Sequence, residues 1–183
     1  MHYTLCDYLL DLFQNALEAG STETSVHWEE DGNNVNLVVE DTGRGMTEQQ
    51  LRRARDPFYT EPGKHPERRV GLGLPFLLQT VEATGGDIGI QSEPGEGTRI
   101  DCRLDLGHVD TPPVGDLADT FVQMCLYEGD YEVRITRRRG ERSYSVSRGE
   151  LTEALGELNS AASVSLLRRY MRGLEQELET MEV

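Results

Sequence analysis

The order in which helical and strand patterns alternate is the feature that most constrains the fold of this chain. Residues 3–19 repeat apolar side chains at helical spacing, and residues 24–41 alternate as two strands around an Asp-Gly-Asn turn. The same order returns later, where a helix is predicted from about Pro75 to a Gly-Gly stop and a second strand pair over residues 87–106. Helices and hairpins in this order predict a domain that combines α-helices with a β-sheet.

A change in composition near residues 107–116 divides the chain. This segment is rich in proline, glycine and aspartate, which is typical of a linker. Beyond it the periodicity predicts a short helix, a hairpin and two further helices, at residues 117–127, 131–147, 150–158 and 162–181. We therefore expect a first domain over residues 1–106, a linker over residues 107–116 and a small α+β appendage over residues 117–183.

The charge and the apolar content exclude several classes of partner. The 183 residues include 33 Asp and Glu against 18 Lys and Arg, a formal charge of −15 at pH 7. Nucleic-acid binding relies on cations that neutralise phosphates, so no nucleic-acid partner is expected. Apolar runs are too short to span a membrane and no signal peptide opens the chain, so a cytoplasmic protein with no membrane contact is expected. Three cysteines without CxxC spacing argue against a disulfide framework or a zinc site.

Three short blocks carry candidate chemistry. They are Asp-Leu-Phe-Gln-Asn at residues 11–15, Asp-Thr-Gly-Arg-Gly-Met at residues 41–46 and Gly-Leu-Gly-Leu at residues 71–74. Asp11 and Asn15 are four residues apart in the first helix and therefore share one polar stripe. Each block alone is also typical of an ordinary turn or of a solvated helix face, so their combination and order decide the interpretation.

The order of the blocks resembles the GHKL superfamily, which includes DNA gyrase B, heat-shock chaperones, histidine kinases and MutL-type repair proteins. Asn15 matches the N box of that superfamily, residues 41–46 match the G1 box and residues 70–76 match the G2 box. Residues 56–60 are similar to the phenylalanine box of histidine kinases, and residues 85–100 to the closing strands with their Gly-Thr dipeptide. The resemblance covers the predicted first domain and implies the Bergerat fold, an α/β two-layer sandwich with a mixed sheet, helices on one face and ATP between the layers.

The resemblance implies a set of residues around the adenine base. The carboxylate of Asp41 would accept a hydrogen bond from the adenine amino group, and such directed contacts give an apolar pocket its specificity. Gly43 and Gly45 would let the backbone approach the base and sugar closely. The other residues implied here are Thr98, as a second polar group at the adenine, and Met46 and Leu74 as pocket walls, although both side chains also suit a core.

A second set of residues is implied at the phosphates. Gly71 and Gly73 precede a helix whose free N–H groups and positive dipole end suit phosphate oxygens. Asn15 would coordinate Mg²⁺ through its side-chain oxygen, and Asp11 would act as the general base for hydrolysis. Aspartate is one methylene shorter than the glutamate that hydrolysing members usually carry at that place. The remaining residues implied in ATP binding are Phe58, Leu72 and Lys64, the last being the only lysine of the chain, for which a plain surface role is the alternative.

The leading interpretation is a Mg²⁺-dependent ATP-binding protein of the histidine-kinase-like ATPase group, either a slow ATPase or a nucleotide-gated regulator. None of its four histidines lies in a helix that resembles a phosphoacceptor segment, so we expect no phosphoacceptor domain of its own. The first alternative is a protein kinase acting in trans, such as an anti-sigma-factor-like serine kinase or a split histidine kinase. The second is a non-catalytic nucleotide sensor within an enzyme complex. Residues 47–70 would close over the nucleotide and couple it to an unknown protein partner.

The last predicted helix and the hairpin before it leave two alternatives open. The helix carries apolar residues at coiled-coil spacing, namely Val164, Leu167, Met171, Leu174, Leu178 and Met181. This spacing suits a coiled-coil seam with a partner helix or in a homodimer through residues 162–181. Because the stretch is short, a helix packed on its own domain is the favoured interpretation. Arginines cluster in the hairpin at residues 134, 137, 138, 139 and 142. They are typical of a solvated hairpin tip, and contact with an acidic partner or a nucleic acid is the alternative.

Overall fold

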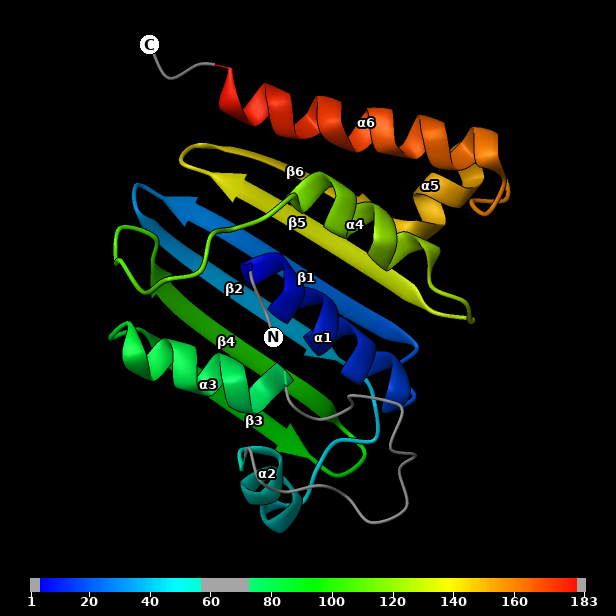
Figure 1. Ribbon diagram of the computed structural model, residues 1–183. Helices are drawn as coiled ribbons and strands as arrows, with labels where there is room; N and C mark the ends of the chain where they lie inside the picture. The colour runs from blue at the N-terminus through cyan, green and yellow to red at the C-terminus, as the bar shows by residue number, and fades with distance from the viewer. Residues whose placement is uncertain (1–3, 57–72, 181–183) are drawn as a thin grey trace.

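The computed structural model describes residues 4–56 and 73–180, which form one six-stranded sheet covered by helices. The strands lie in the order β3-β4-β2-β1-β5-β6 (Figure 1). Their bounds are β1 Glu23–Asp31, β2 Asn34–Asp41, β3 Asp87–Glu93, β4 Gly97–Asp105, β5 Glu132–Arg139 and β6 Arg142–Ser147. Neighbouring strands are antiparallel except β1 and β5, which are parallel, so the sheet is mixed.

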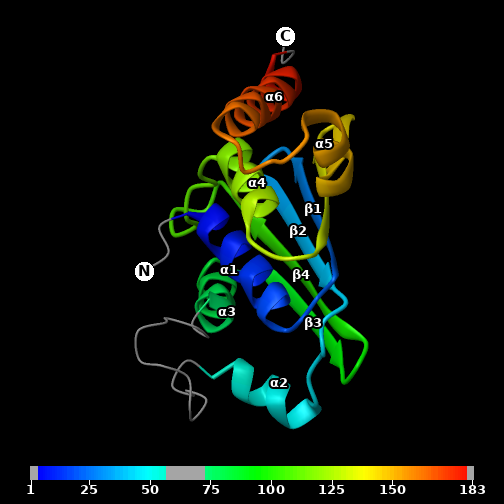
Figure 2. The same cartoon turned by 90° about the vertical axis from the view of Figure 1, so that its right-hand side faces the viewer.

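The helices form a second layer. Their bounds are α1 Leu5–Glu18, α2 Glu48–Ala54, α3 Gly73–Ala83, α4 Leu117–Leu126, α5 Arg148–Leu155 and α6 Ala161–Glu179. Figure 2 shows α1, α3 and α4 on one face of the sheet. Alternate strand residues such as Val26, Trp28 and Leu37 are buried in a core that also contains Leu9 and Phe13 of α1. This arrangement confirms the predicted α/β two-layer sandwich with a mixed sheet and helices on one face.

Local sequence explains where the first helix begins. The hydroxyl of Thr4 accepts a hydrogen bond from the N–H of Asp7 at 3.2 Å, and the carboxylate of Asp7 accepts one from the N–H of Thr4 at 2.9 Å. This reciprocal cap satisfies two N–H groups that have no partner inside the helix. Helix α3, which the sequence predicts to start near Pro75, begins slightly earlier, at Gly73.

Residues 117–180 extend the same sheet and the same core. Strand β5 pairs with β1 along its length, from Glu23 opposite Glu132 to Glu30 opposite Arg139. In the helical layer, the ring of Phe13 in α1 meets the rings of Tyr127 and Tyr131 edge-on, with ring centroids 5.7 Å apart in both pairs. The predicted α+β region is therefore in close contact with the predicted first domain.

The predicted linker is also bound to the first helix. The N–H groups of Leu5 and Cys6 donate to the carbonyl groups of Pro113 and Val114, at 2.8 and 2.9 Å. These N–H groups belong to the first turn of α1, where no intrahelical acceptor exists. The division into separate domains stays a prediction, but the described residues on both sides of the linker share one sheet and one core.

Helix α6 packs against its own chain. Leu167 and Met171 are fully buried and Leu178 is nearly so, whereas Met181 lies outside the described residues. The coiled-coil spacing is thus used within the chain, as the favoured interpretation predicts, and a homodimer through residues 162–181 stays a prediction. In the described part of the chain no helix, α6 included, is long and apolar enough to cross a bilayer.

Candidate functional site

Asp41 ends β2 as a buried carboxylate. The side chain accepts a hydrogen bond from the N–H of Gly43 at 2.7 Å, and Thr98 of β4 lies opposite Asp41 in the sheet register. Burial raises the pKa of Asp41, and the N–H groups of Gly43 and Thr98 offset only part of that rise. The paired ends of β2 and β4 therefore hold a strong hydrogen-bond acceptor in a partly dehydrated position.

The glycines of the loop after β2 are required by contacts within the chain. Gly45 has a φ of +61°, and a Cβ at this position would lie 1.9 Å from the carbonyl oxygen of Glu93. At Gly43 an added Cβ would lie 2.8 Å from both the Cβ of Ala19 and the Oδ1 of Asp41. At both glycines a side chain is excluded because the backbone lies close to other residues of the same chain. The sequence alone does not reveal these contacts.

Ser92 ties the loop to the β3–β4 hairpin, and it is a site residue that sequence analysis does not identify. Its hydroxyl accepts a hydrogen bond from the N–H of Met46 at 2.9 Å and lies 3.0 Å from the carbonyl of Gly97, to which it can donate. It also lies 2.9 Å from the hydroxyl of Thr98, with either group able to donate. The predicted hairpin around Pro94 was the available signal, because it places Ser92 opposite Thr98.

The other side of the loop is fixed to the segment that follows α1. The N–H of Thr42 donates to the hydroxyl of Ser21 at 3.1 Å, and the N–H of Arg44 donates to the carbonyl of Ala19 at 2.9 Å. The loop carrying Asp41 is thereby held between α1 and the β3–β4 hairpin. Its geometry is therefore fixed by hydrogen bonds within the chain.

Asp11 of α1 lies directly against the first turn of α3. A Cβ added to Gly73 would lie 2.7 Å from both the Cβ and the Oδ2 of Asp11, so only glycine fits here. The two helices are also joined by the hydroxyl groups of Tyr8 and Thr80, which lie 2.7 Å apart. A carboxylate is therefore placed at the start of a helix, the end whose positive dipole favours anions.

Asn15 lies on the next turn of α1 from Asp11, and both residues are half-buried. Amide and carboxylate oxygens are ligands that Mg²⁺ accepts, so this pair fits a magnesium ion that also binds phosphate. In the part of the chain that the structure describes, no group of three or more His, Cys, Asp or Glu side chains could hold a metal ion alone. A metal here would therefore need further oxygen ligands from the nucleotide and from water.

The structure describes some of the predicted site residues and not others. Leu74 is buried in the core beside Leu77, and Met46 is half-exposed. Thr98 and Asp41 are brought together at the strand ends. The predicted residues that lie outside the described part of the chain are Phe58, Lys64, Gly71 and Leu72.

The three cysteines lie away from this chemistry. All three thiols are free and buried. Burial raises the pKa of Cys6 to about 11 and the pKa values of Cys102 and Cys125 to about 12. They therefore stay protonated at neutral pH and act as core side chains rather than as nucleophiles or metal ligands.

Comparison with known proteins places this geometry in context. Residues 4–108, more than half of the chain, match the family described as histidine kinase-, DNA gyrase B-, and HSP90-like ATPase. Sporulation kinase E of Bacillus subtilis (strain 168) is 41% identical over 68 residues, which cover 37% of this chain and 9% of that protein. Sensor histidine kinase RcsC of Escherichia coli (strain K12) is 33% identical over 100 residues, which cover 52% of this chain and 10% of that protein.

The chain thus spans about a tenth of the length of these two curated relatives. Among solved structures, a nucleotide-free catalytic domain of histidine kinase ThkA superposes with a TM-score of 0.42 at 22% identity, covering 58% of this chain and 66% of that chain.

Proposed function

Because the chain belongs to the family of histidine kinase-, DNA gyrase B- and HSP90-like ATPases, we propose that it is a Mg²⁺-dependent ATP-binding protein that slowly hydrolyses ATP. The observation that carries this proposal is the contact between Asp11 and Gly73, which brings a carboxylate to the start of α3. A general base has to lie beside the reacting phosphate, and a helix start is a natural place to bind phosphate. The contact between Asp11 and Gly73 and the membership of an ATPase family together favour catalysis over simple binding.

The base end of the site is assigned to Asp41. Its carboxylate is proposed to accept a hydrogen bond from the adenine amino group. Thr98 is proposed to add a second polar contact, held in place by Ser92. A base without an amino group at that position could not make this further hydrogen bond to the buried carboxylate, so Asp41 would select adenine.

The phosphate end is assigned to α1 and α3. Asn15 is proposed to hold Mg²⁺ through its side-chain oxygen, and the ion supplies positive charge to the phosphate oxygens. Asp11 is proposed to accept a proton from the water that attacks the terminal phosphorus. The products are then ADP and inorganic phosphate. Lys64, Gly71 and Leu72 are proposed to complete the phosphate contacts, and Phe58 belongs to the segment proposed to close over the nucleotide.

Phosphoryl transfer to a partner protein is the second candidate function. The finding that favours it is that the curated relatives named above are kinases. In that case the acceptor is a side chain of another protein instead of water, and Asp11 would orient that group. Binding without either reaction would instead support a nucleotide sensor.

A single experiment separates these functions. The purified chain is incubated with γ-labelled ATP and Mg²⁺, and released phosphate and protein-bound label are counted together with nucleotide binding. Asp11→Asn should reduce phosphate release by about a hundredfold, since general-base catalysis contributes that much or more, while ATP still binds. Glu18→Gln is the matched control, because it makes the same chemical change at the far end of α1.

Each outcome decides between the candidates. Release that depends on Asp11 supports the ATPase, and equal release from both variants removes Asp11 as the base. ATP binding without release turns the proposal to transfer in trans or to sensing. Absence of ATP binding by the unmodified chain would contradict the proposed function altogether.

A further inference from the structure

Gly173 lies in the interior of α6 without any need for glycine in the described part of the chain. Its φ is outside the left-handed region, and nothing lies within 4 Å of a Cβ added at this position. Glycine inside a helix destabilises it by about 1 kcal/mol relative to alanine. Because no contact within the described residues requires glycine here, this loss of helix stability points to another molecule that approaches Gly173 closely.

The neighbours of Gly173 on the helix surface resemble the centre of an interface. Leu166 is 42% exposed and Tyr170 is 49% exposed, although both are large and hydrophobic. At 3.6 residues per turn these residues lie on the same side of α6 as Gly173, flanked by Arg169 and Glu177. We call these five residues the α6 stripe. Tyrosine and arginine are among the residue types enriched at the centres of protein interfaces.

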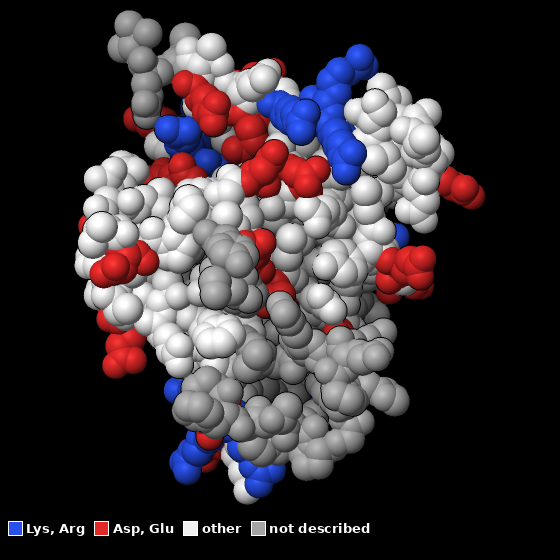
Figure 3. Space-filling model, in the orientation of Figure 1, with Lys and Arg blue, Asp and Glu red and all other residues white. Residues whose placement is uncertain are grey.

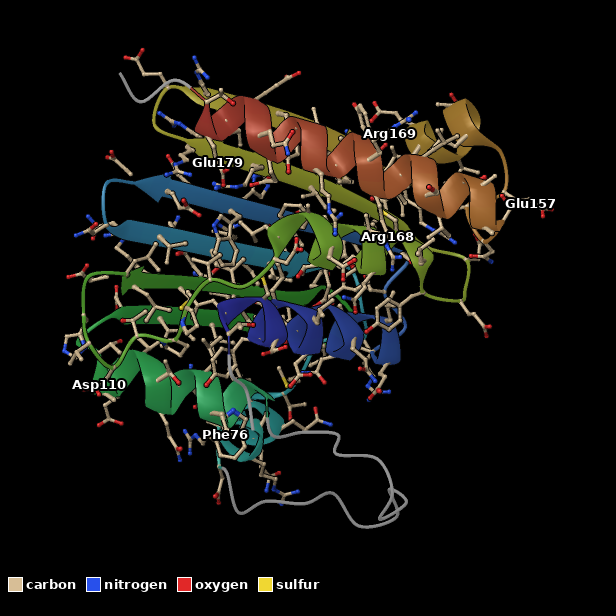
Figure 4. The ribbon with its side chains drawn as sticks, turned by 45° about the horizontal axis from the view of Figure 1, so that its top comes forward. Phe76, Asp110, Glu157, Arg168, Arg169 and Glu179 are labelled. Atoms are coloured by element: carbon tan, nitrogen blue, oxygen red, sulfur yellow. The ribbon has the colours of Figure 1, made fainter. Side chains whose placement is uncertain are left out.

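Charge along α6 changes sign at the same glycine. Arg168, Arg169 and Arg172 precede Gly173, and Glu175, Glu177 and Glu179 follow it. Figure 3 shows basic and acidic groups next to each other on this upper surface, and Figure 4 shows Arg168 and Arg169 on α6 far from Glu179 at its other end.

Some of these charges are already paired within the chain. Arg168 lies 3.4 Å from Asp119, and Glu175 lies 3.4 Å from Arg137. Arg169 and Glu177 have no ion-pair partner among the described residues, and neither has an opposite charge one helical turn away. They stand four residues before and four residues after Gly173. These two charges are therefore free to pair with another molecule.

We propose that the α6 stripe binds a second copy of this chain, with the two α6 helices antiparallel and crossing at Gly173. In this arrangement Arg169 of each copy faces Glu177 of the other, because the two positions are equally distant from the crossing point. The absent side chain at Gly173 lets the helices approach closely, while Tyr170 and Leu166 cover the contact. The contact is isologous, as expected for a two-fold dimer.

The charge order identifies a second copy as the occupant. An antiparallel copy of α6 presents acidic residues where this helix is basic and basic residues where it is acidic, so the stripe is complementary to itself. The buried seam of α6 takes no part, because Leu167 and Met171 are already covered by the same chain. The dimer uses the exposed side of the helix that carries Leu166 and Tyr170, next to the side that packs on α4.

The test is a charge reversal measured by sedimentation equilibrium of the full chain. Arg169→Glu alone and Glu177→Arg alone should each weaken dimerisation by about tenfold or more, because each places like charges together twice. The double variant should restore it, since the pairs are only exchanged. Glu153→Arg, an exposed reversal on α5, is the matched control and should leave the dimer unchanged.

Gly173→Ala gives a second, independent readout. The alanine should raise the thermal stability of the monomer and weaken the dimer, because the helix gains stability while the close crossing is blocked. Circular dichroism confirms that each variant is folded. A chain that stays monomeric at high concentration contradicts the proposal, as does a dimer whose single reversals are not rescued by the double variant. A stripe that binds only a different protein would contradict it equally.

Discussion

The carboxylate of Asp41 is 9% exposed, and this burial raises its pKa above the ordinary value of 3.8. A carboxyl group whose pKa is higher in the folded state stabilises the fold fully below pH 3.8 and loses that contribution as the pH rises through the folded pKa. At neutral pH the ionised group therefore lowers stability. We expect Asp41→Asn to raise the melting temperature at pH 7, with the gain disappearing as the pH falls towards 3.8.

The same variant should bind ATP about tenfold more weakly or worse, because a hydrogen bond to a charged acceptor is lost. Thermal melts over a pH series and calorimetric titration with ATP measure the two effects on one preparation. A variant that melts lower at every pH would mean that the carboxylate is structural. Unchanged ATP affinity would remove Asp41 from the base-binding set.

Individual site residues differ in how far the sequence predicts them. Asp41 and Thr98 are predicted because their motifs stand in a characteristic order, and the structure places them opposite each other. Ser92 is missed, because a lone serine in a strand has no spacing signal and its role depends on the neighbour across the hairpin. Arg137 is misinterpreted as part of a solvated hairpin tip, whereas it is 2% exposed.

At the scale of elements, the start of α3 depends on one missing side chain. Gly73 lies so close to Asp11 that an added Cβ would be 2.7 Å from the Oδ2 of Asp11. We expect Gly73→Ala to displace Asp11 or the first turn of α3. Phosphate release should fall by about a hundredfold, since a misplacement of about 1 Å near reacting groups has effects of that size.

The matched control for this prediction is Gly89→Ala in β3. Gly89 has no atom within 4 Å of an added Cβ and no left-handed backbone, so the variant should retain full activity. Steady-state phosphate release by both variants tests the idea. Equal activity in the two would show that the contact between α1 and α3 does not position Asp11. The periodicity alone predicts α3 but not this contact, because helical spacing has no information about the neighbouring helix.

At the scale of the whole molecule, Arg137 of β5 connects strand β1, near the start of the chain, to helix α6, near its end. Its guanidinium lies 3.0 Å from Glu30 of β1 and 3.4 Å from Glu175 of α6. Replacing it by Ala removes the nearest cation from two mostly buried carboxylates, which should lower the free energy of unfolding by about 3 kcal/mol. Arg138→Ala, which breaks an exposed pair with Glu29 and an exposed hydrogen bond to the carbonyl of Gly140, should cost no more than about 1 kcal/mol. Urea melts of both variants measure the difference, and equal losses would contradict it.

The sequence does not predict how the C-terminal region joins the fold. Local periodicity predicts the β5–β6 hairpin, and the structure contains it at nearly the expected residues. The pairing of β5 with β1 joins Glu23 to Glu132, a separation over which local patterns contain no information. The proline and glycine content of residues 107–116 is equally typical of a free linker and of the bound segment observed here.

This joint sheet leads to a prediction about truncation. A chain of residues 1–106 would leave β1 as an uncovered edge strand and would remove Tyr127 and Tyr131 from the ring of Phe13. Exposed strand edges and apolar surface favour aggregation and loss of cooperative unfolding. We expect residues 1–106 alone to melt without a sharp transition and to bind a hydrophobic dye. Adding residues 107–183 as a separate fragment should restore ATP binding and suppress the dye signal, whereas a sharp melt of the truncated chain at the full-length temperature would show two independent domains.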